Sequence, residues 1–339
     1  MKKIILLIIC LLLSGCYDYQ ELNDMSIVSG IGISYEDDEY VVSLEITESV
    51  KSSNDSSIST KIVKGQDKSI ANAFSKAMKN SNKQVYMELV KVLVLSEDVA
   101  KEGILPVIDY IIMSTNINSN YRMVVTKDID ELFELELDNE SVSNIIVETI
   151  NYGLNSKNSD NLDIKASYLM TNSRSIALPY VDIDEENIII DKTAIFKEDK
   201  LWEIKDDKLY QFLILNSENI NFEKDSNVIS IYKNEIKYDV TDGKVIIKIN
   251  GYGKVIQVND DIDLENEKVY PMLEDMINEE IDDEVTKYLD DTMKENIDIL
   301  GLKDLYYKKT KKKIENIKYE VDVNVNINKN GSLYEALYE

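Results

Sequence analysis

The sequence predicts a multi-domain α+β protein with three domains, each with a mainly antiparallel or mixed β-sheet flanked by helices. Strand-like alternation of apolar and polar residues recurs in short, hairpin-like pairs, and helical spacing of apolar residues recurs between these pairs. One long amphipathic helix is expected near the C-terminus, between Pro271 and Gly301. The 339 residues, 44% hydrophobic and 30% charged, are enough for several globular domains.

The N-terminal part is expected to begin with strands. Residues 27–33 form the first of these, and Gly30 and Gly32 within it indicate a close approach of another backbone or side chain. Residues 36–38 resemble a turn. Residues 89–95 are apolar except for Lys91, which predicts a central strand buried on both faces. Further strands are expected over residues 40–47, 58–64 and 121–126.

Helices are expected between these strands. Asp67 can cap a first helix with one apolar face, and Ser96 can cap a second helix that Gly103 ends. Pro106 stands where the first turn of a third helix would lie, with residues 107, 108, 111 and 112 facing inward. Shorter helices are expected over residues 128–135, 142–150 and 165–171, the last of them after a polar loop over 153–163.

The C-terminal part is expected to start near Lys192 with a hairpin of residues 193–197 and 201–204. A helix over 206–215 follows, and two long strands over 228–238 and 244–258 flank a turn that contains Gly243. The final strand is expected over 319–327. The predicted domains are an N-terminal α+β domain over 25–135, a small middle domain over 136–191 and a C-terminal α+β domain over 192–339.

The N-terminus has the features of a lipoprotein signal peptide. Two lysines precede an apolar run over residues 4–13, and Leu13-Ser14-Gly15-Cys16 ends it. The run is about half of the ~20 residues that a membrane-spanning helix needs. We therefore expect a signal peptide over 1–15, a lipid attachment site at Cys16 and a lipidated tether over 16–24. The alternative is a buried or membrane-inserted N-terminal helix with a chance cysteine.

Charge and composition exclude several functions. The formal net charge is −26, and removal of residues 1–15 would take away two lysines and no acid, giving −28. Such a surface repels nucleic acid. The sequence has no histidine, so it cannot supply a Cys/His zinc site or a Ser-His-Asp triad. An enzyme of this composition would have to use carboxylates, lysine or tyrosine alone. We expect no metal and no cofactor, and attachment to a membrane by lipid.

Three motifs partly resemble binding sites. Gly30-Ile31-Gly32 lacks the third glycine of a dinucleotide-binding turn, and a crowded strand is the simpler interpretation. The acidic residues 260–267 fail the EF-hand pattern, because positions six and twelve are Asn266 and Met272. The lysines within residues 308–313 could contact a phosphate-rich membrane surface, but the solvent face of a helix end explains them better.

In their order and spacing, several short motifs together resemble the Ger(x)C family, the C subunits of spore germinant receptors. These motifs are Leu13-Ser14-Gly15-Cys16-Tyr17-Asp18, Glu21-Leu22-Asn23-Asp24, Gly30-Ile31-Gly32-Ile33, Val92-Leu93-Val94-Leu95-Ser96-Glu97, Ala194-Ile195-Phe196-Lys197 and Asp298-Ile299-Leu300-Gly301. The chain departs from the family pattern at Tyr17, where tryptophan is usual, at Met87-Glu88 and at Glu203.

The resemblance implies a non-enzymatic lipoprotein on the outer face of the spore inner membrane. It would assemble with integral-membrane A and B subunits of a receptor that triggers germination on sensing nutrients, and it would act as an interaction scaffold. The family offers no established catalytic or ligand residues, so only Cys16 is carried over. Two alternatives are an extracytoplasmic substrate-binding lipoprotein of a transporter, which predicts two similar α/β lobes, and a carboxylate-dependent cell-wall hydrolase.

Overall fold

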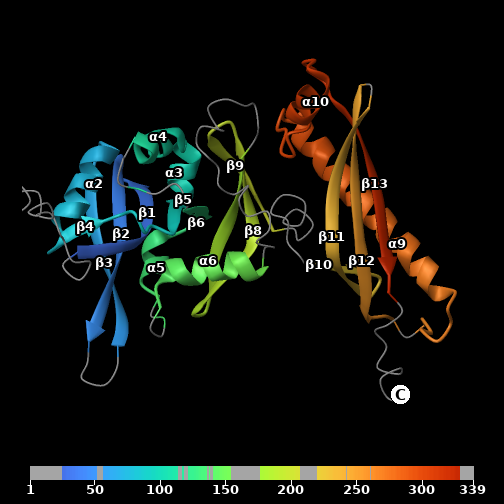
Figure 1. The fold of residues 1–339 in the computed structure, drawn as a ribbon, viewed down its shortest axis with the longest axis horizontal. Coiled ribbons are helices and arrows are strands. Elements are labelled where there is room, and N and C mark those ends of the chain that lie inside the picture. The colour runs from blue at the N-terminus through green and yellow to red at the C-terminus, as the bar shows by residue number, and fades with distance from the viewer. Residues whose placement is uncertain are drawn as a thin grey trace, which may run out of the picture.

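The computed structural model describes residues 25–51, 56–113, 117, 121–135, 137, 140–153, 176–206, 220–241, 243–259 and 261–328. Within these residues the chain forms a mixed sheet of nine strands and a second sheet of four strands, each flanked by helices (Figure 1). The predicted α+β class is confirmed. No helix in the described part is both long and apolar enough to span a membrane.

The first sheet has the strand order β3-β2-β1-β5-β6-β7-β8-β9, with β4 paired to the start of β1. Strands β1, β2 and β3 form an antiparallel meander, β1, β5, β6 and β7 run parallel, and β7, β8 and β9 are antiparallel again. Their bounds are β1 Met25–Glu36, β2 Glu39–Lys51, β3 Ser56–Asp67, β4 Gln84–Tyr86, β5 Val92–Ser96, β6 Arg122–Thr126, β7 Ala177–Asp184, β8 Asn187–Lys197 and β9 Lys200–Lys205.

Helices cover both faces of this sheet. The predicted central strand β5 alternates between two cores, because Leu93 and Leu95 pack with α2, α3 and α4 whereas Val92 and Val94 pack with α5 and α6. This burial on both faces confirms the prediction and is the usual environment of parallel strands. The helices are α2 Ile70–Lys79, α3 Glu97–Glu102, α4 Leu105–Met113, α5 Ile129–Phe133 and α6 Val142–Gly153.

Local details correct three of the predictions. Residue Ser69, not Asp67, is the N-cap of α2, and the Asp67 carboxylate instead accepts a hydrogen bond from the Ser69 amide at 3.0 Å. The central strand begins at Val92, and Leu89 is 49% exposed in the turn before it. Ile112 is 52% exposed, because residues 107, 108 and 111 already fill the buried side of α4.

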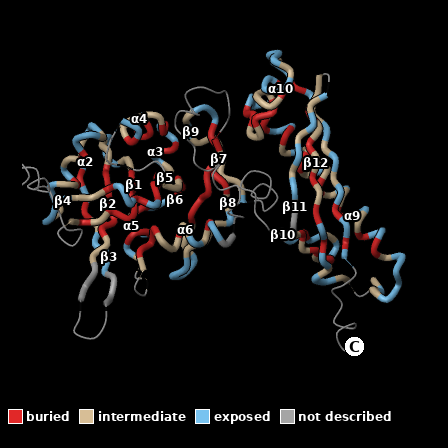
Figure 2. Tube along the Cα trace, viewed as in Figure 1, coloured by how far each residue is buried: buried red, intermediate tan, exposed pale blue. Residues whose placement is uncertain are grey.

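The second sheet consists of β10 (Ile220–Lys224), β11 (Asn227–Thr241), β12 (Lys244–Gln257) and β13 (Lys318–Ile327) in that order. The long helix α9 (Val269–Lys294) packs on one face through a buried stripe of residues 273, 277, 281, 285 and 289, whose i,i+4 spacing confirms the predicted amphipathic helix. It ends at Lys294, earlier than the predicted Gly301, and α10 (Leu302–Thr310) follows. Figure 2 shows buried residues running through the strands of both sheets.

The hairpin predicted to open the C-terminal domain is part of the first sheet. Lys192 lies inside β8, and β8 pairs with β7 along most of its length. The sheet therefore continues across the predicted boundary at residue 192, while the domain limits as such stay a prediction. Several expected features lie outside the described residues: Cys16 and the signal peptide, the polar loop beyond Gly153, the helix over 165–171 and, from residue 207 on, the helix expected over 206–215.

A small apolar cluster joins the hairpin to the segment after α9. Ile195 of β8 and Ile297 are both fully buried in it, with Trp202 and Ile299 packed against them. Lys197 Nζ lies 3.1 Å from the carboxylate of Glu295 beside this cluster. The two sheets are thus linked through side chains at this point.

Candidate functional site

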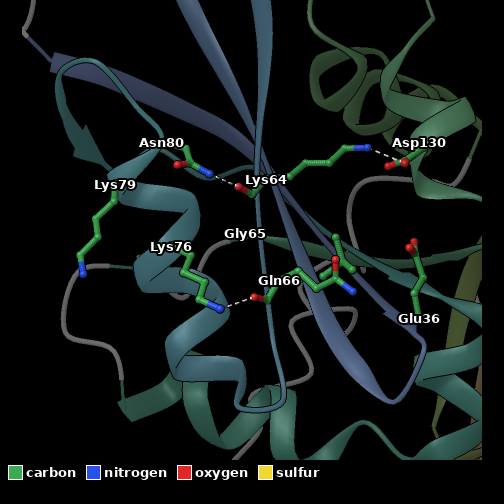
Figure 3. A pocket seen from close by; sticks show the side chains of 9 residues that line it. Glu36, Lys64, Gly65, Gln66, Lys76, Lys79, Asn80 and Asp130 are labelled. Atoms are coloured by element: carbon green, nitrogen blue, oxygen red, sulfur yellow. Dashed lines mark hydrogen bonds and ion pairs between the residues drawn. The ribbon is translucent and has the colours of Figure 1, made fainter.

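A pocket of about 490 Å³ opens beside the first sheet, between β3 and α2 (Figure 3). Lys64, Gly65 and Gln66 of β3 form its floor, and the lysine side chains of α2 together with Asn80, the C-cap residue of α2, line one side. Asp130 of α5 and Glu36 at the end of β1 complete the opposite side. Most lining groups are polar or charged, so the pocket is suited to a polar ligand.

Gly65 determines how closely α2 lies on β3. A Cβ atom at this position would lie 2.2 Å from the backbone nitrogen of Ala77 and 2.3 Å from the carbonyl oxygen of Ala73. Both are atoms of the helix backbone, so no side-chain rotation could relieve the clash. Because Gly65 has no side chain, the backbone of α2 can lie directly against β3, and this contact sets the position of the pocket wall.

Hydrogen bonds tie the pocket lysines to the surrounding elements. The Lys64 ammonium group pairs with the Asp130 carboxylate, and Asn80 Nδ2 donates to the Lys64 carbonyl oxygen at 2.7 Å. Lys76 Nζ donates to the Gln66 carbonyl oxygen at 2.8 Å (Figure 3). Lys79 extends away from this network in the same view. Two of the three lysines therefore hold β3, α2 and α5 together.

The carboxylate beside the pocket that titrates unusually is Asp67. A hydrogen bond from the Lys76 ammonium, together with those from the Ser69 amide and the Asn72 side chain, lowers the pKa of Asp67 to about 2. The ammonium and carboxylate groups lie 2.8 Å apart. Asp67 thus stays ionised throughout the neutral and mildly acidic range and keeps the start of α2 fixed to the end of β3.

A second polar cluster is buried beneath the sheet, around Glu45 of β2. This side chain is 1% exposed, and its carboxylate accepts hydrogen bonds from Ser29 Oγ at 2.7 Å, the Val142 amide at 2.7 Å and the Ser143 amide at 3.3 Å. The Ser143 hydroxyl also donates to it. The negative charge therefore lies at the N-terminus of α6, where free amide groups and the helix dipole favour it.

Sequence reasoning missed both the pocket and the Glu45 cluster. The alternation of β2 predicts that Glu45 shares a face with Ser43 and Thr47, but not that this face lies against α6. The sequence carries no clear signal for this burial, because the alternation of Ser43, Glu45 and Thr47 with apolar residues is equally typical of a strand whose polar face meets solvent.

The motifs considered from sequence have structural roles where they are described. A Cβ atom at Gly30 would lie 2.0 Å from Ser143 Oγ, and one at Gly32 would lie 2.4 Å from Ile129 Cγ2, so close packing of α5 and α6 explains both glycines. The lysines within residues 308–313 are exposed at the end of α10. In the described part of the chain, no group of three or more Asp, Glu, Cys or His residues is placed to hold a metal ion.

Two protein-family models match the chain. The model described as "Spore germination protein N-terminal domain" matches residues 18–183, and that described as "Spore germination B3/ GerAC like, C-terminal" matches residues 191–331. Together they cover most of the sequence.

Curated relatives and a solved structure are also similar. Spore germination protein A3 of Bacillus subtilis (strain 168) is 24% identical over 215 residues, which is 59% of this chain and 56% of that protein. The putative spore germination protein YfkR of the same organism is 26% identical over 243 residues, 63% of this chain and 60% of that protein. The matches thus span less than two thirds of either relative. The crystal structure of the GerBC protein is 16% identical, with a TM-score of 0.49, over 91% of this chain and 99% of that one.

Proposed function

The chain belongs to the spore germination GerAC family, and from this premise we propose that it is the lipid-anchored C subunit of a nutrient germinant receptor. The observation that supports this proposal best is the match of both family models, in order, along most of the chain. In this role the protein is a non-catalytic scaffold that contacts the integral-membrane A and B subunits.

Attachment to the membrane is proposed to occur through acylated Cys16, on the outer face of the spore inner membrane. The tether over 16–24 would span at most ~30 Å when extended, so the folded part would stay close to the bilayer. Two acyl chains suffice for stable anchoring at ~0.8 kcal/mol per buried CH₂ group. The strongly acidic protein has little electrostatic attraction to anionic lipids, which makes lipid the main source of affinity.

The alternative, a substrate-binding lipoprotein of a transporter, predicts two similar lobes. The two described sheets are not similar, since one is a mixed sheet of nine strands and the other has four strands in a different order. This difference argues against two similar lobes and favours the scaffold proposal. The other alternative is a carboxylate-dependent cell-wall hydrolase. It predicts that the protein turns over cell-wall material, and that replacing one or two acidic residues abolishes this turnover.

The anchor is tested by replacing Cys16 with alanine in spores and measuring membrane retention, incorporation of labelled palmitate and nutrient-triggered germination. Cys10→Ala is the matched control, because Cys10 is the other cysteine of the chain and lies within the expected signal peptide. We expect Cys16→Ala to lose label, retention and response, and Cys10→Ala to keep all three. Continued labelling and retention of Cys16→Ala would refute the anchor, and normal germination after deletion of the gene in a strain without related copies would refute the receptor role.

A further inference from the structure

The part of the second domain that follows α9 is unusually basic for this chain. Residues 303–318, which include α10 and the turn after it, contain seven lysines and two acids, whereas the whole chain has a formal net charge of −26. One of the acids, Asp304, pairs with Lys308 at 2.9 Å, and the other is Glu315. Four exposed lysines form what we call the basic end: Lys309, Lys311, Lys312 and Lys313. The local charge is thus opposite in sign to that of the protein as a whole.

The helix dipole of α10 explains only part of this run of lysines. Lys309 lies in the last turn of α10, where the negative end of the dipole favours a cation. Lys311, Lys312 and Lys313 follow the helix, and the dipole favours them little because its effect falls off within the last turn. Among the described residues, none of these four lysines forms an ion pair. Contacts within the chain therefore do not account for the basic end.

Hydrogen bonds hold the turn after α10 in a defined conformation. Lys311 has a left-handed backbone, with φ 59°, and its amide donates to the Tyr307 carbonyl oxygen at 2.7 Å. The Thr310 hydroxyl donates to the Tyr306 carbonyl oxygen at 2.8 Å and accepts a hydrogen bond from the Lys312 amide at 3.1 Å. The backbone that carries the lysines is thus ordered, and the basic end is a fixed surface of the folded protein.

The strands next to α10 carry acids that are paired with lysines of their own. The helix packs beside β11 and β12, where Lys248 Nζ lies 2.8 Å from the Asp239 carboxylate. The Lys244 ammonium likewise pairs with the Glu320 carboxylate of β13. The hydrogen bond from Lys248 lowers the pKa of Asp239, and the nearby charge of Lys309 lowers it further. These two acids are therefore already neutralised, and the basic end keeps its excess of positive charge.

Much of the acidic surface lies far from the basic end. Figure 1 shows α10, the start of β13 and the turn between β11 and β12 at one end of the second sheet. The Tyr319 hydroxyl at the start of β13 donates to the carboxylate of Asp290, close to the C-terminal end of α9. Glu274 and Asp275, near the other end of α9, are more than ~20 Å from Asp290 at ~1.5 Å per residue. Charges separated by more than ~8 Å are largely screened at physiological ionic strength, so these acids do not cancel an attraction at the basic end.

We propose that the basic end contacts the headgroups of anionic lipids, so that this end of the second sheet faces the bilayer. An extended anionic surface can meet all four exposed lysines at once, and each lysine near such a surface strengthens binding about fivefold. Tyr307, which is 44% exposed beside them, is a residue type enriched at membrane–water interfaces. The inference rests on the proposed lipid anchor, which would keep the chain near the bilayer and allow this weaker contact to form.

The test is co-sedimentation of the purified full-length chain carrying Cys16→Ala with two kinds of vesicle, phosphatidylcholine alone and phosphatidylcholine mixed with phosphatidylglycerol. We expect a preference for the anionic vesicles that is lost in ~1 M salt, where the Debye length is ~3 Å. Replacing all four lysines of the basic end with glutamine should weaken binding to the anionic vesicles by about tenfold or more. Replacing the same four with arginine should preserve binding, because arginine keeps the charge.

The matched control is a variant with the same change in net charge at four exposed lysines of the first domain. These are Lys61, Lys68, Lys79 and Lys200, each replaced with glutamine. The proposal is overturned if the chain shows no preference for anionic vesicles, or if the control variant loses as much binding as the basic-end variant. Equal binding of a DNA duplex at the same salt concentration would assign the basic end to polyanions in general. Because this chain lacks Cys16, the result does not depend on the anchor, which the palmitate labelling in spores tests separately.

Discussion

Replacing Glu45 should weaken the attachment of α6 to the first sheet more than any other single carboxylate change described here. Its buried carboxylate accepts hydrogen bonds from Ser29, Val142 and Ser143, and the last of these donates both its amide and its hydroxyl. Hydrogen bonds to a charged group contribute ~1.5–3 kcal/mol each. Because the four bonds share one carboxylate and the neighbours can relax, we expect Glu45→Ala to cost ~3–5 kcal/mol, equivalent to two or three such bonds at the lower end of that range.

The isosteric change Glu45→Gln separates charge from shape. The amide oxygen of glutamine can replace one carboxylate oxygen, but its NH₂ group must then face a donor, such as the Val142 amide that lies 2.7 Å from Glu45 Oε1. One buried donor without an acceptor costs ~1–3 kcal/mol. Glu45→Gln should therefore destabilise less than Glu45→Ala but clearly more than a surface change.

Amide hydrogen exchange in the first turn of α6 is the direct assay, since the Val142 and Ser143 amides donate to Glu45. Thermal melts report the overall effect. Glu48→Gln on the same strand is the control, with an expected change within ~0.5 kcal/mol. Unchanged exchange at Val142 and Ser143 in both Glu45 variants would refute the assignment of this carboxylate as the partner of α6.

Three further predictions concern other contacts. Gly65→Ala should destabilise the protein by ~1–3 kcal/mol in thermal melts, because its Cβ would lie 2.2 Å from the Ala77 nitrogen; an unchanged melting temperature would contradict the close packing. The carboxyl group of Asp67, followed by NMR, should titrate near its lowered pKa of about 2. Its contribution to stability should be present above pH ~4 and be lost as the pH falls toward ~2, so a midpoint near 3.8 would contradict its ion pair. Ile297→Ala should cost ~2–5 kcal/mol and red-shift the fluorescence of Trp202, the single tryptophan, whereas an unchanged spectrum would argue against contact between the sheets.

Much of the secondary structure follows from local patterns. The turn at Asp37-Asp38 was predicted from composition, and both residues have the positive φ values, 49° and 62°, that asparagine, aspartate and glycine tolerate best. Ser96 caps α3 as predicted, because its hydroxyl oxygen accepts a hydrogen bond from the Val99 amide at 3.2 Å. In such cases the residues that determine the structure lie within a few positions of one another.

The candidate pocket depends on contacts between distant residues, which these patterns do not encode. Lys64 and Asp130 are paired across 66 positions of sequence, and Lys76 reaches the carbonyl oxygen of Gln66 from the next element. Each lysine by itself is indistinguishable from the other lysines of a highly charged chain. A single sequence therefore predicts the elements around the pocket but not the pocket.

The hairpin of β8 and β9 is predicted in the C-terminal part because local patterns do not show which sheet it joins. The alternation of residues 193–204 specifies which two strands pair, and the positive φ of Glu198, 58°, fits the tight turn between them. It does not specify which sheet accepts the free edge of β8, and that choice depends on β7, whose Pro179 still allows pairing with Thr193. Once β8 is placed in the first sheet, Ile195 faces Ile297 from the chain after α9. Within the described residues, the hairpin therefore joins the first sheet to the segment that follows α9.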